Sequence, residues 1–424
     1  MMKRNPGAIK HGTIAAIDVG SSKICCFIAQ MDGDNPPKVI GIGQQASHGM
    51  KSGNIVDMEA LEDSILNAVH SAEQMASETV NTVLVNLSGG SPTSHNINLE
   101  VAINGHEVTE TDLKQALEHA SKIQGPEGNP EQGRQLIHSL PTGFTLDGNR
   151  GVKDPRGMHG EMLGVTMHLI TAAANSLRNL TTCVKRCHLD PLGFVLTPYA
   201  SGLACLVDDE MELGVTLVDM GGTTTSIAVF SEGKLVFSDI IPVGGHHVTN
   251  DVARGLSTPV AEAERMKTLY GHAVATVTDE REMIDVPQVG EEAGSQPQQV
   301  PRSLLVGIIQ PRLEETFEIV RSKLEMSGFD KIGGRRVVLT GGASQLPGLP
   351  DLASLILDKQ VRIGRPIRVN GLADATGGPS FSTCAGLLTY ATIAHNDVQT
   401  EKTPEETQPQ NFISKFGKWF SENF

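Results

Sequence analysis

The feature that most constrains this chain is a short motif that occurs twice. The stretch LVDMGGTTTSIAVF, from Leu217 to Phe230, contains an apolar run, a carboxylate, a turn of small residues and a second apolar run. This order predicts a β-hairpin with a sharp turn and with Asp219 at its mouth. Glycines let such a turn approach a ligand closely, and its N–H and hydroxyl groups can hold phosphate oxygens. An aspartate beside phosphates indicates a divalent cation between them, which for Mg²⁺ is usually bound through water.

The second copy lies near the N-terminus, in AIDVGSSKICCFIA from Ala16 to Ala29. One Asp-x-Gly turn alone is usually only a turn. Two copies at matching offsets, about 200 residues apart, indicate two related halves with one phosphate-binding hairpin each. The matched residues are Asp18 with Asp219, Gly20 with Gly221, and Ser22 with Thr223.

The paired hairpins resemble those of the superfamily of actin, the sugar kinases and the DnaK-type chaperones. The stretch VVLTGGASQLPGL, from Val337 to Leu349, is similar to the strand and glycine pair against which the adenine base lies in that superfamily. The segment AERMK, from Ala263 to Lys267, is similar to the helix that contacts adenosine and ribose in MreB and the chaperones. Its Glu and Lys are three residues apart and share one helix face. The resemblance implies a two-halved, actin-like α/β ATPase fold.

The resemblance also implies a role for each residue of these motifs. Asp18 and Asp219 would orient Mg²⁺ and its waters. The phosphates would be held by Gly20, Ser21, Ser22, Lys23, Gly221, Gly222, Thr223 and Thr224. Adenosine would be held by Glu264, Lys267, Gly341, Gly342 and Ala343.

Residues 90–171 predict a small α+β unit of strand, helix, strand and strand, with Thr109 or Thr111 as the helix N-cap. The order VLVNLSGG…VTETDL…IHSLPTGFTLD…GVKDPRGMHG…HLIT resembles the FtsA family of actin-like cell-division proteins, which carries its own insertion in the first half. This resemblance covers essentially the whole chain. The expected division is 1–89 and 172–212 for the first half, 90–171 for the insert, 213–394 for the second half with an insert at about 245–310, 395–410 for a disordered linker and 411–424 for an amphipathic helix.

One departure from the superfamily concerns hydrolysis. In MreB and the DnaK-type chaperones, a Glu followed by Pro begins the helix that connects the halves and helps to position the attacking water. The corresponding pair here is Thr197-Pro198. A threonine cannot act as a carboxylate base at pH 7. We therefore expect ATP binding with slow or absent hydrolysis, and we assign no catalytic residue.

Composition limits the partners and the cellular compartment that we expect for the chain. A net charge of −15 argues against nucleic acid as a partner. No stretch of about 18 apolar residues is present, so we expect no membrane-spanning helix, and the N-terminus lacks the apolar core of a signal peptide. The six cysteines lack the spacing of a disulfide framework or a zinc site, which indicates a reduced, cytosolic protein. Adjacent His246 and His247 point in different directions on any regular element, which argues against a shared metal.

The last residues have a different composition. Residues 395–410 are polar with no apolar period, which indicates a disordered linker, whereas 411–424 contain the only Trp and four of the twelve Phe. On a helix of about 100° per residue, six large apolar side chains fall within roughly 140° of arc. They are Phe412, Ile413, Phe416, Trp419, Phe420 and Phe424, with Lys415 and Lys418 on the other side. A helix of about 21 Å is too short to span a bilayer, so we expect it to lie in the membrane surface with its lysines near anionic head groups. The alternative is a helix that docks on the body or on a partner protein.

By resemblance, the chain would be an adaptor that binds ATP and Mg²⁺ and polymerises with itself on the inner face of the cytoplasmic membrane, at the division septum. There it would tether FtsZ and help to recruit later division proteins. Arg302 and Arg312 match basic positions where the family binds the acidic C-terminal tail of FtsZ, although either could be an ordinary surface arginine. Two alternatives remain: a pilus-assembly-type scaffold with a similar extra subdomain, and a small-molecule kinase. A kinase needs a carboxylate base near a substrate cleft, and the sequence offers no clear candidate.

Overall fold

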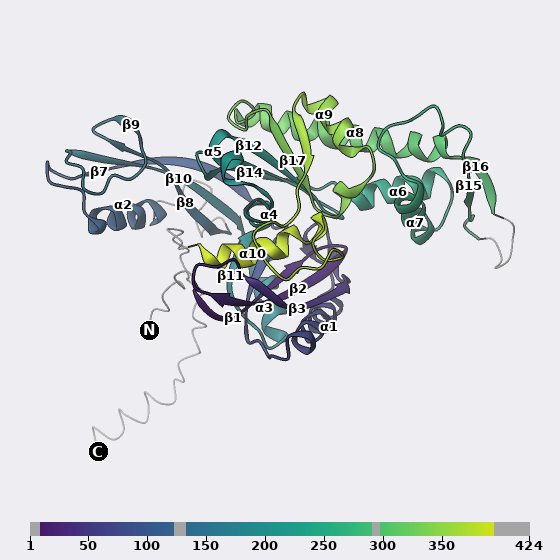
Figure 1. The fold of residues 1–424 in the computed structure, drawn as a ribbon, viewed down its shortest axis with the longest axis horizontal. Helices are drawn as coiled ribbons and strands as arrows, with labels where there is room; N and C mark the ends of the chain where they lie inside the picture. The colour runs from purple at the N-terminus through teal and green to yellow at the C-terminus, as the bar shows by residue number, and fades with distance from the viewer. Residues whose placement is uncertain (1–8, 123–132, 291–296, 394–424) are drawn as a thin grey trace, which may run out of the picture.

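The computed structural model describes residues 9–122, 133–290 and 297–393. Figure 1 shows two α/β halves, with an additional sheet and helix extending from one end of the molecule and a helical region extending from the other. The predicted linker at 395–410 and the predicted amphipathic helix at 411–424 lie outside the described residues.

The first half is built on a five-stranded sheet in the order β11-β6-β1-β2-β3. β1 and β2 form the antiparallel hairpin that the sequence predicted, and β6 and β11 continue the sheet in parallel. The helices α1 and α3 bury their apolar side chains against one face of this sheet. The bounds are His11–Val19 for β1, Lys23–Asp32 for β2, Lys38–Ala46 for β3, Met50–Lys51 for β4, Asn54–Ile55 for β5, Met58–Ala76 for α1, Thr82–Leu87 for β6, Ala174–Arg186 for α3 and Asp190–Leu196 for β11.

Local residue choices explain why α1 lies close to β3. Asp57 caps the helix, because its side chain accepts a hydrogen bond from the backbone N–H of Ala60 at 3.1 Å. Gly41 and Gly43 face the helix backbone, where a Cβ atom would overlap carbonyl oxygens of α1. The two glycines therefore allow the strand and the helix to pack at backbone distance.

The second half repeats the same plan, as the duplicated motif predicted. Its five-stranded sheet has the order β14-β13-β12-β17-β18, with an antiparallel hairpin of β12 and β13 and with β17 parallel to β12. α8 and α9 bury apolar side chains in the core of this half. The bounds are Asp208–Leu213 for α5, Val215–Met220 for β12, Thr225–Ser231 for β13, Lys234–Ile241 for β14, Arg302–Ser327 for α8, Arg336–Thr340 for β17, Leu349–Leu357 for α9 and Gln360–Ile363 for β18.

A smaller group of elements extends from the second half, at the right of Figure 1. Two helices follow β14, and a short antiparallel pair of strands precedes α8. The bounds are Gly245–Gly255 for α6, Val260–Tyr270 for α7, Met283–Val286 for β15 and Gln298–Pro301 for β16, and two 3₁₀ turns elsewhere in the half are η2 at Gly342–Gln345 and η3 at Pro379–Phe381.

Two helices lie between the halves and are buried along almost their whole length, except for Thr392 at the end of the second. They are α4, Thr197–Cys205, and α10, Ser382–Thr392. A helix that is apolar on all sides belongs in the core of a large protein, and both belong to one hydrophobic cluster with residues of both sheets.

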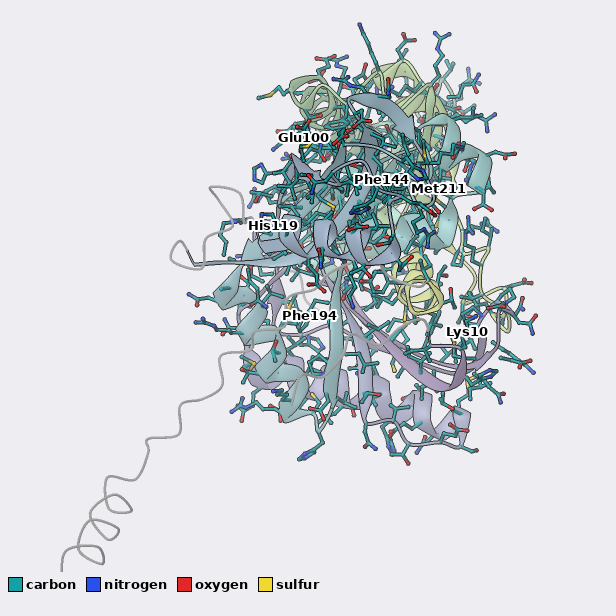
Figure 2. The ribbon with its side chains drawn as sticks, turned by 90° about the vertical axis from the view of Figure 1, so that its left-hand side faces the viewer. Lys10, Glu100, His119, Phe144, Phe194 and Met211 are labelled. Carbon is teal, nitrogen blue, oxygen red and sulfur yellow. The ribbon has the colours of Figure 1, made fainter. Side chains whose placement is uncertain are left out.

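The inserted unit is a four-stranded sheet in the order β7-β10-β8-β9 with α2 on one face. Thr109 caps α2, because its hydroxyl accepts a hydrogen bond from the backbone N–H of Asp112 at 3.3 Å. Side chains alternate along β7, and Figure 2 shows Glu100 on the side of the sheet away from His119 of α2. The sequence missed one edge strand, β9. The bounds are Thr93–Ala102 for β7, Glu110–Lys122 for α2, Arg134–Leu146 for β8, Asn149–Val152 for β9 and Met162–Ala173 for β10.

The insert also contacts the second half, along the edge strand β14. His168 of β10 donates from Nδ1 to the carbonyl oxygen of Leu235 at 2.9 Å, and Ser94 of β7 lies 2.6 Å from Nε2 of the same ring. Asn96 donates to the carbonyl oxygen of Val236 at 3.3 Å. The unit that interrupts the first half in sequence is therefore held by both halves in space.

Candidate nucleotide site between the two halves

The turns of the two hairpins meet face to face where the halves adjoin. Thr223 of the second turn donates a hydrogen bond to the hydroxyl of Ser21 in the first turn at 2.6 Å. Beside this contact, a Cβ atom at Gly222 would overlap the hydroxyl of Ser22. The structure thus brings together the turns that sequence reasoning assigned to phosphate, although they are about 200 residues apart in the chain.

The glycines of the turns are required for their shape. A Cβ atom at Gly20 would lie 2.7 Å from the carbonyl oxygen of Lys23, and one at Gly221 would lie 3.1 Å from that of Thr224. In each turn the glycine N–H bonds back to this same carbonyl oxygen. The matching geometry in both halves places backbone and hydroxyl groups of both turns where the halves meet, as a phosphate cradle needs. The Lys23 ammonium lies 3.4 Å from the ring centroid of Phe381, which is a cation–π contact.

Asp18 ends the first strand of the first hairpin and is buried. Its carboxylate oxygen Oδ1 accepts a hydrogen bond from Asn86 of β6 at 2.7 Å. The pKa of Asp18 is raised to about 7, mainly by burial and also by the nearby charge of Asp219, against the opposing effect of the Lys23 charge. The two aspartates therefore interact electrostatically across the boundary between the halves, and a cation between them would favour the charged form of both.

Asp219 occupies the matching place in the second half. Its oxygen Oδ2 accepts hydrogen bonds from Ser201 of α4 at 2.5 Å and from Thr383 of α10 at 3.4 Å. Burial raises the pKa of Asp219, although these two hydroxyl groups lower it in part. Within the described ranges, no group of three or more His, Cys, Asp or Glu side chains is arranged to hold a metal. A Mg²⁺ ion here would take most of its ligands from water and phosphate, which fits its ordinary coordination.

The predicted adenosine residues surround the start of α6. Lys267 of α7 donates hydrogen bonds to Glu264 at 2.7 Å and to the carbonyl oxygen of Gly245 at 3.2 Å. Thr249 of α6 also donates to the Glu264 carboxylate. Burial raises the pKa of Glu264, but the hydrogen bonds from Lys267 and Thr249 outweigh it and hold that pKa below its usual range. These two donors therefore hold the Glu264 carboxylate in its charged form.

The glycine pair after β17 completes the site. Gly341 has φ of 85° and lies against the backbone of Met220 and the carboxylate of Asp219, so a side chain would not fit there. Ala343 is near the start of α6, where a Cβ atom at Gly245 would lie 3.1 Å from its methyl group. All four predicted motifs therefore meet at one site, and the residues present fit a nucleotide with its cation.

Sequence reasoning missed several residues of this site. His246, considered only as a metal ligand, has its Nε2 atom 3.2 Å from the Ser22 hydroxyl across the cleft. The next residue, His247, accepts a hydrogen bond at Nδ1 from the backbone N–H of Gly244 at 3.1 Å and caps α6. Asn86, Ser201 and Thr383 were also missed, although a polar side chain within an apolar strand or helix was a usable signal.

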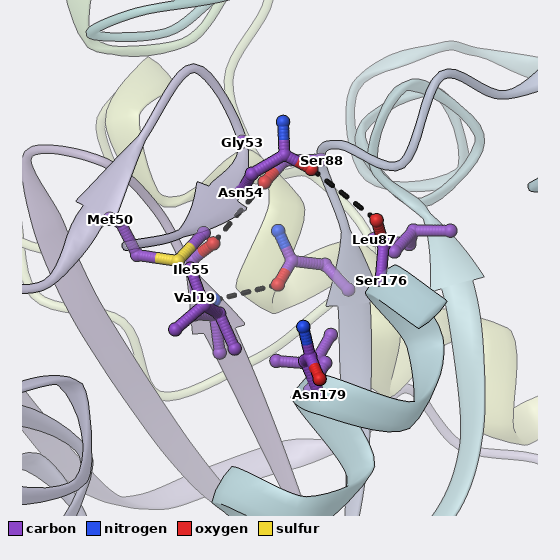
Figure 3. Close-up of a pocket in the computed structure, with 11 residues that line it drawn as sticks. Val19, Met50, Gly53, Asn54, Ile55, Leu87, Ser88, Ser176 and Asn179 are labelled. Atoms are coloured by element: carbon purple, nitrogen blue, oxygen red, sulfur yellow. Dashed lines mark hydrogen bonds between the residues drawn. The ribbon is translucent and has the colours of Figure 1, made fainter. Parts of the chain in front are cut away.

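A cavity of about 50 Å³ lies next to the first hairpin (Figure 3). Val19, Leu87 and Ser88 line it, together with Asn54 and Asn179. Ligand pockets have volumes of roughly 300–1,000 Å³, so this cavity can hold water but no nucleotide. This cavity is therefore not the predicted nucleotide site.

The two arginines predicted to bind a partner are already paired within the chain. Arg302 lies 3.1 Å from carboxylate oxygens of both Asp279 and Glu282. Arg312 lies 2.5 Å from a carboxylate oxygen of Asp251 and also contacts Glu315. Their role toward a partner stays a prediction, and a partner's carboxylate would have to replace one of these.

Comparison with known proteins decides the family. The model of the family "Cell division protein FtsA" matches residues 216–386, and the model "SHS2 domain inserted in FTSA" matches residues 89–171. The FtsA of Agrobacterium fabrum is 46% identical over 97% of this chain and 95% of its own length. The FtsA of Pseudomonas aeruginosa is 34% identical over 97% and 98%. The chain belongs to the FtsA family. It is therefore a cell-division protein with an actin-like fold and an FtsA-type insert.

Solved structures agree on the fold of this FtsA-family chain. A PilM–PilN type IV pilus biogenesis complex superposes with a TM-score of 0.63 at 17% identity, over 91% of this chain and 99% of that one. MreB5 of Spiroplasma citri bound to ADP superposes with a TM-score of 0.51 at 14% identity, over 89% and 95%. At such identities the likeness shows the shared fold, whose members generally bind nucleotide with Mg²⁺. Among the described residues, every helix is too short or too polar to cross a membrane.

Proposed function

We propose that this FtsA-family chain is an ATP-binding adaptor that assembles on the inner face of the cytoplasmic membrane at the division septum and tethers FtsZ filaments there. The observation that carries the nucleotide part is the pair of buried aspartates, Asp18 and Asp219, placed behind two turns that face each other. Mg²⁺ bound with ATP would supply positive charge to offset the phosphates. Gly20 to Lys23 and Gly221 to Thr224 would hold the phosphates.

ATP serves binding rather than rapid turnover in this proposal. Thr197 begins α4, at the position that the resemblance to MreB and the DnaK-type chaperones assigns to a glutamate. Its hydroxyl donates to the carbonyl oxygen of Leu87 at 3.0 Å and carries no charge at neutral pH, so it cannot act as a general base. Glu264, Lys267 and the segment from Gly341 to Ala343 would hold adenosine. Nucleotide then biases the closure of the cleft between the halves.

The membrane part rests on the sequence of residues 411–424. Six large apolar side chains supply roughly 1.5–3 kcal/mol each when fully buried, whereas ordering each backbone residue costs roughly 1–2 kcal/mol. One such segment therefore binds weakly and reversibly. Several segments on one polymer bind far more tightly through effective concentration, so that self-assembly and membrane attachment reinforce each other.

The proposed binding site for FtsZ lies in the outer region of the second half. The acidic tail of FtsZ would exchange with Glu282 at Arg302 and with Glu315 at Arg312, because these two carboxylates are about half exposed. Exposed ion pairs contribute only about 0–1 kcal/mol, so the exchange costs little. Later division proteins would bind elsewhere, and nucleic acid is not an expected partner.

The experiment is co-sedimentation with liposomes that contain anionic lipid. The full chain and a chain without residues 411–424 are each tested with Mg·ATP, and with and without FtsZ. We expect only the full chain to pellet and to carry FtsZ with it. Equal pelleting of the truncated chain would remove the membrane role from the segment. Membrane binding without FtsZ recruitment would refute the tether.

A further inference from the structure

One helix supports the aspartates of both halves. Thr197 and Ser201 are one turn apart in α4, so their side chains project from the same face. Ser201 contacts Asp219 directly, and Thr197 is linked to Asp18 through Asn86. Both aspartates are therefore connected to the helix that lies between the halves.

Both the oxygen and the nitrogen of the Asn86 side-chain amide form hydrogen bonds. Its oxygen accepts a hydrogen bond from the backbone N–H of Val19 at 2.6 Å. Its nitrogen donates one hydrogen to Asp18 at 2.7 Å and the other to Thr197 at 3.1 Å. Because a backbone N–H can only donate, it determines which end of the amide is oxygen. Asn86 is 2% exposed, so these three hydrogen bonds hold its amide in one orientation.

Thr197 is equally constrained. Its hydroxyl donates to the carbonyl oxygen of Leu87 at 3.0 Å and accepts from Asn86, so both roles of the hydroxyl are used. The residue is 8% exposed. A side chain held in this way cannot activate water, but it can fix the amide that holds Asp18.

In the second half, two hydroxyl groups hold the aspartate in place of an amide. Ser201 and Thr383 both contact oxygen Oδ2 of Asp219, and their hydroxyl oxygens are 3.0 Å apart. The other oxygen, Oδ1, lies toward Gly341. In each half, therefore, one carboxylate oxygen is held by buried donors from adjacent elements.

We propose that Asn86, Thr197, Ser201 and Thr383 are positioning residues, which hold one oxygen of each aspartate and so fix the orientation of both carboxylates beside the water shell of the bound cation. The inference rests on the proposed Mg·ATP site. Removal of groups that orient a metal's ligands typically lowers metal affinity about 10–100-fold, and this is the expected effect here.

The test separates cation binding from nucleotide binding. A fluorescent ATP analogue is bound to the full chain, and Mg²⁺ is titrated to find the concentration at half saturation. The same analogue is also titrated in EDTA. The variants are Thr197→Val and Ser201→Ala, which preserve volume or reduce it slightly, and Thr197→Ser restores the hydroxyl. Thr389→Val is the matched control, because Thr389 is a buried hydroxyl on α10 that bonds to the carbonyl oxygen of Ala385.

We expect Thr197→Val and Ser201→Ala to raise the half-saturating Mg²⁺ concentration at least tenfold, with nucleotide affinity in EDTA changed less than twofold. Thr197→Ser and Thr389→Val should match the original chain. Unchanged Mg²⁺ titrations, or equal weakening with and without Mg²⁺, would overturn the inference while the proposed function stands. Failure of the original chain to bind the analogue in either condition would instead refute the proposed function, and the inference with it.

Discussion

Gly386 of α10 lies against the backbone carbonyl oxygen of Ala200 in α4, so closely that a Cβ atom at position 386 would overlap that oxygen. The two helices pack at backbone distance at this crossing. They also carry Ser201 and Thr383, whose hydroxyl groups meet at Asp219. The spacing of the helices between the halves and the geometry of the candidate cation site are therefore set at the same place.

We expect Gly386→Ala to destabilise the protein by about 1–3 kcal/mol, because overpacking forces the helices apart. Mg·ATP affinity should fall as well, since Ser201 and Thr383 move with their helices. Chemical unfolding and nucleotide titration measure the two effects. Gly307→Ala is the control: Gly307 is an exposed residue of α8 with no atom within 4 Å of a Cβ, so this change should stabilise by about 0.5–1 kcal/mol. Equal effects of the two variants would contradict the close crossing.

Asp18→Asn should weaken Mg·ATP binding and stabilise the protein without nucleotide. The pKa of Asp18 rises from 3.8 to about 7 on folding, so the folded state favours the neutral carboxyl. The stability contributed by this group is complete below pH 4 and is lost as pH rises toward 7. Above that pH the variant should be more stable by up to about 4 kcal/mol, at 1.4 kcal/mol per pKa unit.

Urea unfolding at pH 5 and pH 8, each with and without Mg·ATP, tests this expectation. The difference in unfolding free energy between the variant and the original chain should grow with pH when nucleotide is absent. A constant difference would show that Asp18 is not the group that titrates.

His168 should produce the opposite pH dependence at the contact between the insert and β14. Burial lowers the pKa of His168 to about 4 from 6.5, and the hydrogen bond to the carbonyl oxygen of Leu235 only partly opposes this. Its stability contribution is complete above pH 6.5 and is lost as pH falls toward 4. At pH 5 the expected loss is about 2 kcal/mol.

Comparison of unfolding free energies at pH 7.5 and pH 5 checks the role of His168. His168→Gln should lose stability at pH 7.5 but should depend less on pH than the original chain. His119→Gln, at an exposed position of the same insert, serves as the control and should follow the original chain. A steep loss that persists in His168→Gln would assign the pH dependence to another group.

The contact between Ser22 and His246 should slow the entry of nucleotide. A phosphate between the turns must separate these side chains, and a net hydrogen bond contributes about 0.5–1.5 kcal/mol. We expect His246→Ala to speed ATP association by up to about tenfold in stopped-flow measurements. In a double-mutant cycle with Ser22→Ala, the two changes should be non-additive. His70→Ala, at an exposed site on α1, should leave the rate unchanged, and strict additivity would exclude the contact as a barrier.

The elements of the fold were largely predictable, because their signals are local. The Asp-x-Gly turns, the helix N-cap at Thr109, and the shared helix face of Glu264 and Lys267 all follow from spacing within a few residues. The edge strand Asn149–Val152 was missed because it is short and polar. Asn86 and Ser201 were missed because each has its partner in another element.

The sequence by itself determined that this chain has two related α/β halves, each with one phosphate-type hairpin, and an insert within the first half. Glycine conformation and apolar periodicity act over a few residues and can therefore be recognised without a fold. Only the tertiary structure decided which groups support Asp18 and Asp219, that Arg302 and Arg312 are paired within the chain, and that the insert contacts β14. Each of these depends on how separate elements pack, which no local pattern specifies.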